Sequence, residues 1–325
     1  MPSAADRLGY DCMAIALHAV PPAPPQPSSN TRAPGALVLD ELLPLRAGLG
    51  AAFFGAIAYA QAMAEAAGRD PVHAVHEYRK AVRRARAVVR LARPIVPRRA
   101  FSALNQELRQ AVAASSATRD AHVLEAALEH LPGRSSDPAR RAAREALEAI
   151  RAEQGSTQGA QRVLRHGAWT LNGLPARFFE SLPRDVCWLD LESGLRGSYR
   201  RARKARAEAG RTGDFAAIHD FRKRVKELRY QLELLEAAAE LALKRDHQQL
   251  ARLAQRLGTV TDLIALRRLV AGRPELDSAA GRRLVRATDG RIALLLAHEL
   301  PRTAALFEKR PRRFVARIMR RLRAA

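Results

Sequence analysis

Apolar residues recur three and four positions apart along most of the chain from Leu37 onward, which is the spacing of one face of an α-helix. Ala, Leu, Arg and Glu, which favour helix, dominate this part of the sequence. Gly and Pro interrupt the pattern at intervals, for example at 68–71, 131–138 and 209–214, where they end helices. No segment alternates apolar and polar positions for long enough to predict a strand. We therefore expect an all-α fold built from bundles of antiparallel helices.

The first 36 residues have a different composition. The segment "VPPAPPQPSSNTRAPG" is rich in proline and serine, which favour an extended chain without a packed core. We expect residues 1–36 to form a disordered tail and residues 37–325 to form the folded region.

The folded region contains an internal repeat. The segment "VHEYRKAVRRAR" at 75–86 reappears as "IHDFRKRVKELR" at 218–229, and His76 and His219 are 143 residues apart. A second pair follows at almost the same offset, "SATRDAHVL" at 116–124 and "GTVTDLIAL" at 258–266. The repeat predicts two halves of similar build, 37–184 and 188–325. It also predicts that helix 72–92 superposes on helix 215–237 through a pseudo-twofold axis.

Each repeated helix carries cations on one face and apolar residues on the other. At about 100° per residue, basic residues and a histidine share a face in each copy: His76, Arg79, Lys80, Arg83, Arg86 and Arg90, and then His219, Arg222, Lys223, Lys226 and Arg229. The helix that opens the second half adds a row of Arg196, Tyr199, Arg203 and Arg206. Like charges four residues apart repel by about 0.2–0.5 kcal/mol. Two such faces in matching register therefore indicate a shared anionic ligand.

The overall charge strengthens this interpretation. The chain has 56 Lys and Arg against 33 acidic residues, a formal net charge of +23 at pH 7. Such an excess indicates a polyanionic partner: nucleic acid, an acidic membrane surface or a phosphate polymer. The only cysteines, Cys12 and Cys187, form no disulfide framework, and no convincing secretory signal is present. We expect a cytoplasmic protein.

One uncharged stretch, 47–64, is long enough to consider as a membrane span. Its high Ala and Gly content makes it only moderately apolar, and no second stretch of this kind exists. We expect a buried helix of the bundle there and no membrane span.

These motifs resemble the conserved histidine α-helical domain (CHAD) family. In that family each half carries a stretch like "VHxxRVxx[RK][RL]xR" followed by "GxxRD" or "Gx[LV]xD". The segments "GLRGSYRRARKA" (194–205) and "FEKRPRRF" (307–314) are also similar to family segments. The resemblance covers about 37–325. The sequence departs from the family pattern at Lys80, Ser116, His122 and Lys223.

The resemblance implies two four-helix bundles related by a pseudo-twofold axis, with basic faces along a central groove or channel. It also implies binding of inorganic polyphosphate and association with polyphosphate or polyester storage granules. Arginine suits such a ligand because its planar fork binds phosphate oxygens in pairs. We expect all residues of the three rows named above, including the two histidines and Tyr199, to bind polyphosphate, with no enzymatic activity, cofactor or metal.

Two alternatives remain open. Nucleic acid would make similar phosphate contacts, although only 5% of residues are aromatic, which is few for stacking bases. A phosphohydrolase or phosphotransfer role has weak support from His73, His76 and Glu77 and from His219 and Asp220. Nearby cations would repel a metal at these positions, so we expect Glu77 to pair with Lys80 and Asp220 with Arg224. Neither a GxxxxGK[ST] loop nor an ExExK signature occurs.

Overall fold

The computed structural model describes residues 37, 39, 43–115, isolated positions between 124 and 148, and then 157–239, 241–272 and 278–322. All of them belong to the compact unit Pro34–Ala325. The expectations for the tail and for the motif at 116–123 lie outside the described residues.

Helices account for nearly all of the described chain. The first half contains α1 (Leu45–Ala66), α2 (Pro71–Leu91), α3 (Arg98–Ala114), α6 (Thr157–Trp169) and α7 (Leu174–Glu180). The second half contains α8 (Trp188–Thr212), α9 (Phe215–Ala239), α10 (Leu241–Ala271), α11 (Ala279–Arg302), α12 (Ala304–Phe307) and α13 (Pro311–Leu322). No strand occurs among the described residues, and the prediction of an all-α fold is confirmed.

Local sequence fixes the ends of several helices. The Asp70 carboxylate accepts a hydrogen bond from the His73 backbone N–H at 3.0 Å and so caps α2, with Pro71 in the first turn. Ser278 caps α11 in the same way through the Gly281 N–H at 3.1 Å. Gly213 separates α8 from α9 with φ at 65°, a left-handed conformation that glycine adopts without strain.

The apolar faces predicted for the repeated helices are in the core. Tyr78 and Val82 of α2 are fully buried, as are Phe221 and Val225 of α9. Burying these stripes removes apolar surface from water, which is the main driving force for bundle formation. The cationic residues of the same helices are therefore left at the edges of the core or outside it.

Helix α1 is long and apolar enough to cross a membrane by length and composition alone. In the structure it packs against α2, α6 and α7, and its Phe53 ring lies 4.6 Å from the ring of Phe178 in α7. This is the packing of a core helix in a bundle, the arrangement expected from its moderate hydropathy.

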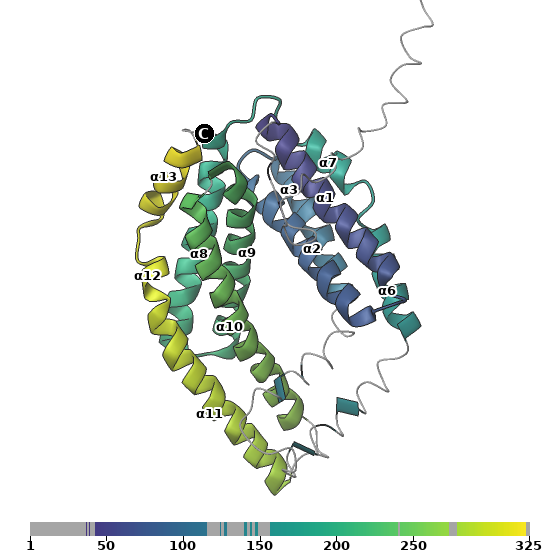
Figure 1. Cartoon of the computed structure of the whole chain (residues 1–325), viewed down its shortest axis with the longest axis vertical. Coiled ribbons are helices and arrows are strands. Elements are labelled where there is room, and N and C mark those ends of the chain that lie inside the picture. Colours follow the sequence, from purple (N-terminus) through teal and green to yellow (C-terminus); the bar gives the residue numbers. More distant parts are fainter. Residues whose placement is uncertain are drawn as a thin grey trace, which may run out of the picture. The chain divides into compact units, whose positions relative to one another are not determined.

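Helices α2 and α9 pack against each other where the two halves meet (Figure 1). Arg84 of α2 forms a buried ion pair with Glu233 of α9, and Arg90 of α2 pairs with Glu227 of α9 at 2.5 Å. Arg84 and Glu227 are 143 residues apart, as are Arg90 and Glu233. Arg84 therefore pairs with the residue equivalent to Arg90, and Arg90 pairs with the residue equivalent to Arg84. The offset exchanges the two pairs, which is the reciprocal pattern that a twofold axis generates.

Candidate anion-binding surface

One group of cations surrounds His219 and draws on three helices. We call it the His219 cluster: His219, Arg222 and Lys223 of α9, Arg83 of α2 and Arg268 of α10. Partial burial of the imidazole, followed by the four neighbouring cations, lowers the pKa of His219 below that of a free imidazole. The ring is therefore neutral at pH 7, and it can donate one N–H to an anion.

A second group of cations surrounds one acidic residue. We call it the Glu227 cluster, and its members are Glu227, Arg86, Arg90, Arg109, Arg201 and Arg224. The Glu227 carboxylate lies 2.5 Å from Arg90, 2.7 Å from Arg201 of α8 and 3.7 Å from Arg224. Burial alone raises the pKa of the Glu227 carboxyl, but the arginines outweigh this effect and lower the pKa.

The Glu227 cluster has an excess of positive charge. Burial, the charge of Arg90 and, to a smaller extent, the charges of Arg109 and Arg224 lower the pKa of Arg86 to about 10. The Arg86 Nε–H donates to the Asn105 side-chain oxygen at 2.9 Å, which fixes the guanidinium beside α3. Since one carboxylate is shared by several guanidinium groups, an additional anion would be stabilised here.

Four members of the two clusters were missed by the sequence analysis: Arg109, Arg201, Arg224 and Arg268. Arg224 was treated only as the partner of Asp220. Arg109 and Arg268 belong to helices α3 and α10 outside the repeated motif, and only packing brings them to α2 and α9.

Arg79 and Arg222 occupy equivalent positions in the repeat and both face a neighbouring helix of their own half. Arg79 is only 7% exposed, and its guanidinium donates to the Val112 carbonyl at 2.8 Å and to the Ser115 hydroxyl at 2.9 Å. A Cβ added at Gly258 of α10 would lie 3.2 Å from Nη2 of Arg222. The motif glycine therefore leaves room for Arg222. The expectation that Arg79 lies on an exposed cationic face is wrong, because it ties α2 to the end of α3.

Part of the row of residues expected on α8 (Arg196, Tyr199, Arg203 and Arg206) faces the C-terminal helices. Tyr199 is fully buried, its ring lies 4.0 Å from that of Phe314, and its hydroxyl lies 3.1 Å from both the Leu306 and Lys309 carbonyls. Burial raises the pKa of Tyr199 to about 12. The expectation that Tyr199 lies in an accessible row with the arginines of α8 is wrong, because an aromatic ring on this side of α8 completes the core.

The three arginines of the same row have different surroundings. Arg206 donates to the Thr303 hydroxyl at 2.9 Å and to the Leu300 carbonyl at 3.0 Å. Arg203 is exposed, and its charge acts on Tyr199. Arg196 pairs within its own helix with Glu192 at 3.3 Å. Helix α8 contributes Arg201 to the Glu227 cluster instead.

The local pairs expected beside the two histidines are confirmed. Lys80 lies 3.0 Å from Glu77, and Arg224 lies 3.2 Å from Asp220. His76 is largely exposed and lies 3.8 Å from Glu77. Within the described part of the chain, no group of three or more His, Cys, Asp and Glu residues could hold a metal ion.

The remaining predicted residues lie on α9. Lys226 is partly buried, one turn after the cations around His219. Arg229 is also partly buried, with its guanidinium carbon 5.2 Å from the centre of the Tyr230 ring. The repeated motif thus places some of its cations on the outside of the bundle and others in contacts between helices.

Comparison with known proteins gives one family and one fold. A family model described as the CHAD domain matches residues 51–271. A solved structure, the crystal structure of the CHAD domain from the plant Ricinus communis, matches with a TM-score of 0.61 at 21% sequence identity. The match covers 86% of this chain and 97% of the plant chain. No curated protein sequence matches.

Proposed function

Because the chain belongs to the CHAD family, we propose that it binds inorganic polyphosphate through the cations carried by α2 and α9. The proposal covers binding alone and assigns no chemical step to these residues. It rests on one observation above all: cations of both halves meet at one group, since Arg90 of the first half and Arg201 of the second lie 2.5 Å and 2.7 Å from the Glu227 carboxylate. A second group beside the same crossing supports it. The charge of Arg83 in the first half lowers the pKa of His219 in the second, together with Arg222, Lys223 and Arg268.

The chemistry of polyphosphate fits this arrangement. The polymer carries roughly one negative charge per phosphate, and it is flexible enough to follow cations that are spread over several helices. Guanidinium groups bind phosphate oxygens in pairs, and an ammonium group binds them as a point charge. Binding releases counterions from the polymer, so affinity falls steeply as salt concentration rises.

The two clusters have different parts in this proposal. The His219 cluster contains exposed Lys223 and partly exposed Arg83, which are available to the polymer. The Glu227 cluster is tied together by its carboxylate, so its arginines mainly contribute a positive potential next to the crossing of α2 and α9. Arg79, Tyr199 and Arg206 do not belong to the proposed binding surface, because their polar groups bind neighbouring helices.

Titration with polyphosphate of defined length at several salt concentrations tests the proposal. The double variant Arg83→Glu/Lys226→Glu should bind at least about tenfold more weakly than the unaltered protein, with a salt slope lower by about two. The matched control is Arg99→Glu/Arg184→Glu, which makes the same charge change at two exposed arginines of α3 and the α7–α8 loop. Equal losses in the two variants would mean diffuse attraction without a site.

Two further arms complete the experiment. Arg83 and Lys226 have contacts of their own, so the milder Arg83→Gln/Lys226→Gln variant and thermal unfolding separate lost binding from lost folding. Duplex DNA as competitor addresses the alternative partner. If DNA displaces polyphosphate at an equal concentration of phosphate groups, the proposal that the protein prefers polyphosphate to nucleic acid is wrong.

We also propose a cytoplasmic location at polyphosphate granules. A fluorescent fusion of the full chain should gather on granules in cells that accumulate polyphosphate. The Arg83→Glu/Lys226→Glu fusion should remain dispersed. Accumulation of the unaltered fusion on polyester granules alone would contradict this location.

A further inference from the structure

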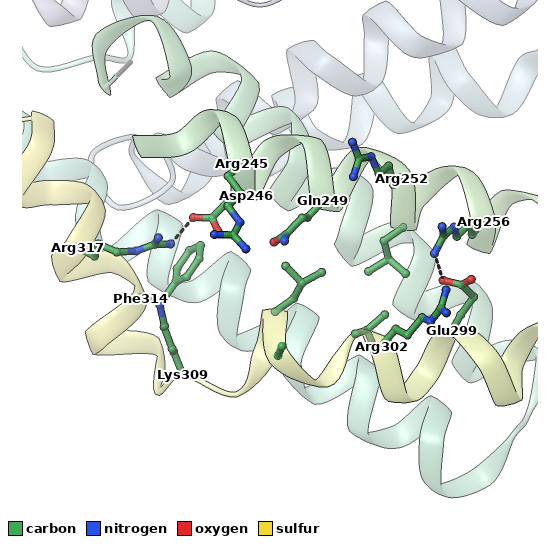
Figure 2. A pocket seen from close by; sticks show the side chains of 14 residues that line it. Arg245, Asp246, Gln249, Arg252, Arg256, Glu299, Arg302, Lys309, Phe314 and Arg317 are labelled. Atoms are coloured by element: carbon green, nitrogen blue, oxygen red, sulfur yellow. Dashed lines mark hydrogen bonds and ion pairs between the residues drawn. The ribbon is translucent and has the colours of Figure 1, made fainter. Parts of the chain in front are cut away.

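A pocket outside the α2/α9 surface lies among α10, α11, α12 and α13 (Figure 2). Its volume is about 410 Å³, which is within the range of small-molecule sites. Six basic side chains and two carboxylates line it, which leaves an excess of four positive charges: Arg245, Arg252, Arg256, Arg302, Lys309 and Arg317 against Asp246 and Glu299.

The carboxylates of the pocket are already paired. Asp246 forms an ion pair with Arg317 of α13, and Glu299 of α11 pairs with Arg256 of α10 at 3.0 Å. These two pairs are the dashed lines at opposite ends of the pocket in Figure 2. They fix α10 to α11 and α13, and they neutralise the negative charge that would otherwise repel an anion.

Four cations of the pocket remain without such partners. Among the described residues, none forms an ion pair or side-chain hydrogen bond with Arg245, Arg252, Arg302 or Lys309. Arg245 and Arg252 come from α10, whereas Arg302 ends α11 and Lys309 precedes α13. Cations from both walls therefore surround the same opening and give it a positive potential that attracts an anion.

The middle of the pocket has a different character. Leu253, Leu306 and Phe314 line it with apolar surface, and the Phe314 ring is held in place against Tyr199 at 4.0 Å. The Gln249 side chain stands between the two charged ends in Figure 2 and supplies an amide donor and acceptor. A bare phosphate chain has no group that would use this apolar floor.

We propose that this pocket binds a small amphipathic anion in which several negative charges adjoin a planar apolar group, the chemistry of a nucleoside triphosphate. The charged part lies against unpaired cations at one end. The planar part lies over Leu253 and Leu306. The Gln249 amide reaches the polar edge of this planar part, and guanidinium groups at the other end of the pocket stack on its face. Arg245 and Arg256 are eleven residues apart on α10, about 16 Å along the helix. That length allows such a ligand to lie along α10.

Calorimetric titration with magnesium-free ATP, tripolyphosphate and adenosine tests each part of this proposal. ATP should bind at least about tenfold more tightly than tripolyphosphate, which has only the charge, and than adenosine, which has only the planar group. If tripolyphosphate binds as tightly as ATP, the apolar floor contributes nothing and the proposal is wrong.

Two variants locate the binding site. Arg252→Glu/Arg302→Glu should weaken ATP binding at least about tenfold, because two unpaired cations become acids. Gln249→Glu should also weaken it, since this change of similar size places a carboxylate between the charged ends. The matched control is Arg283→Glu/Arg286→Glu, which makes the same charge change at exposed positions of α11 outside the pocket.

ATP binding to the pocket can be tested separately from polyphosphate binding to the α2/α9 surface. The Arg83→Glu/Lys226→Glu variant should retain ATP binding, and Gln249→Glu should retain polyphosphate binding. Loss of ATP binding in Arg83→Glu/Lys226→Glu, with none in the pocket variants, would assign ATP to the α2/α9 surface and overturn the proposal. Equal losses in Arg252→Glu/Arg302→Glu and the α11 control would also overturn it.

Discussion

Helices α2 and α9 occupy equivalent places in the two halves, but they carry opposite charges at two of the equivalent positions through which they pair. Arg84 and Arg90 of α2 correspond in the repeat to Glu227 and Glu233 of α9. In a contact between two identical helices, each arginine would meet an arginine of the partner. With two different copies in one chain, both contacts become attractive, as the Arg84–Glu233 and Arg90–Glu227 pairs show.

The repeated basic motif has two different roles in α2 and α9. Arg79 and Arg222 are matched in sequence and both reach toward a neighbouring helix of their own half. The histidines are matched as well, yet His76 lies beside an acidic residue whereas His219 lies among cations. A shared sequence motif thus gives shared helix packing, while the electrostatic surroundings of the two histidines differ.

The largest expected effect concerns the buried pair at the crossing. Glu233→Ala leaves Arg84, whose side chain is only 2% exposed, without its carboxylate, and should lower the free energy of unfolding by about 3–5 kcal/mol. Urea denaturation measures this loss. The exchanged pair Arg84→Glu/Glu233→Arg should recover part of it, and a loss below about 1 kcal/mol in the single variant would contradict the importance of the pair.

The next effect concerns Glu227 and depends on pH. Arg90, Arg201 and Arg224 lower its pKa below 4.5, so the ionised carboxylate stabilises the fold above that pH. The stabilisation is lost as pH falls through the lowered pKa. Glu227→Gln should therefore cost about 1.5–3 kcal/mol at pH 7, and the difference from the unaltered protein should narrow in acid. A difference that is the same at both pH values would refute this coupling.

A smaller effect distinguishes the two histidines. The pKa of His219 is lowered in the free protein, and a bound polyanion should raise it, so binding takes up a proton. Polyphosphate affinity should then rise by up to about fivefold as pH falls through the region below 6.5, since exposed charge contacts are worth up to about 1 kcal/mol. His219→Ala should remove this dependence and His76→Ala should keep it. The reverse result would exchange the roles of the halves.

The smallest effect tests the space around Arg222. Gly210 has nothing within 4 Å of an added Cβ, so Gly210→Ala in α8 should stabilise the protein by about 0.5–1 kcal/mol through helix propensity. In Gly258→Ala the same gain is offset by crowding of the Arg222 guanidinium, whose Nη2 lies 3.2 Å from the added atom. Thermal unfolding of Gly258→Ala should therefore show no gain in stability. An equal gain in both variants would mean that Arg222 moves without cost.

The helices and their core faces could be predicted from the sequence because local rules determine them. Spacing of apolar residues, glycines and prolines located α2 and α9, and the buried Tyr78 and Phe221 followed from the helical periodicity. The pairs Glu77–Lys80 and Asp220–Arg224 were predicted because they lie within one helix.

The composition of the site could not be predicted in the same way. A helical wheel gives directions around one helix and does not show which neighbour covers a given side. Arg79 shares a face with His76 on the wheel, but α3 covers it, and Tyr199 shares a face with Arg203, but α13 covers it. Arg109 and Arg268 join the clusters only through packing between helices.

In the proposed function, a single polyphosphate chain contacts both halves at the crossing of α2 and α9. Calorimetric titration with a short polyphosphate of defined length measures it most directly, through the number of chains bound at saturation. We expect one chain per protein molecule and a loss of affinity when either Arg83 or Lys226 alone is changed to Gln. Two chains bound independently, one lost with each single variant, would contradict it.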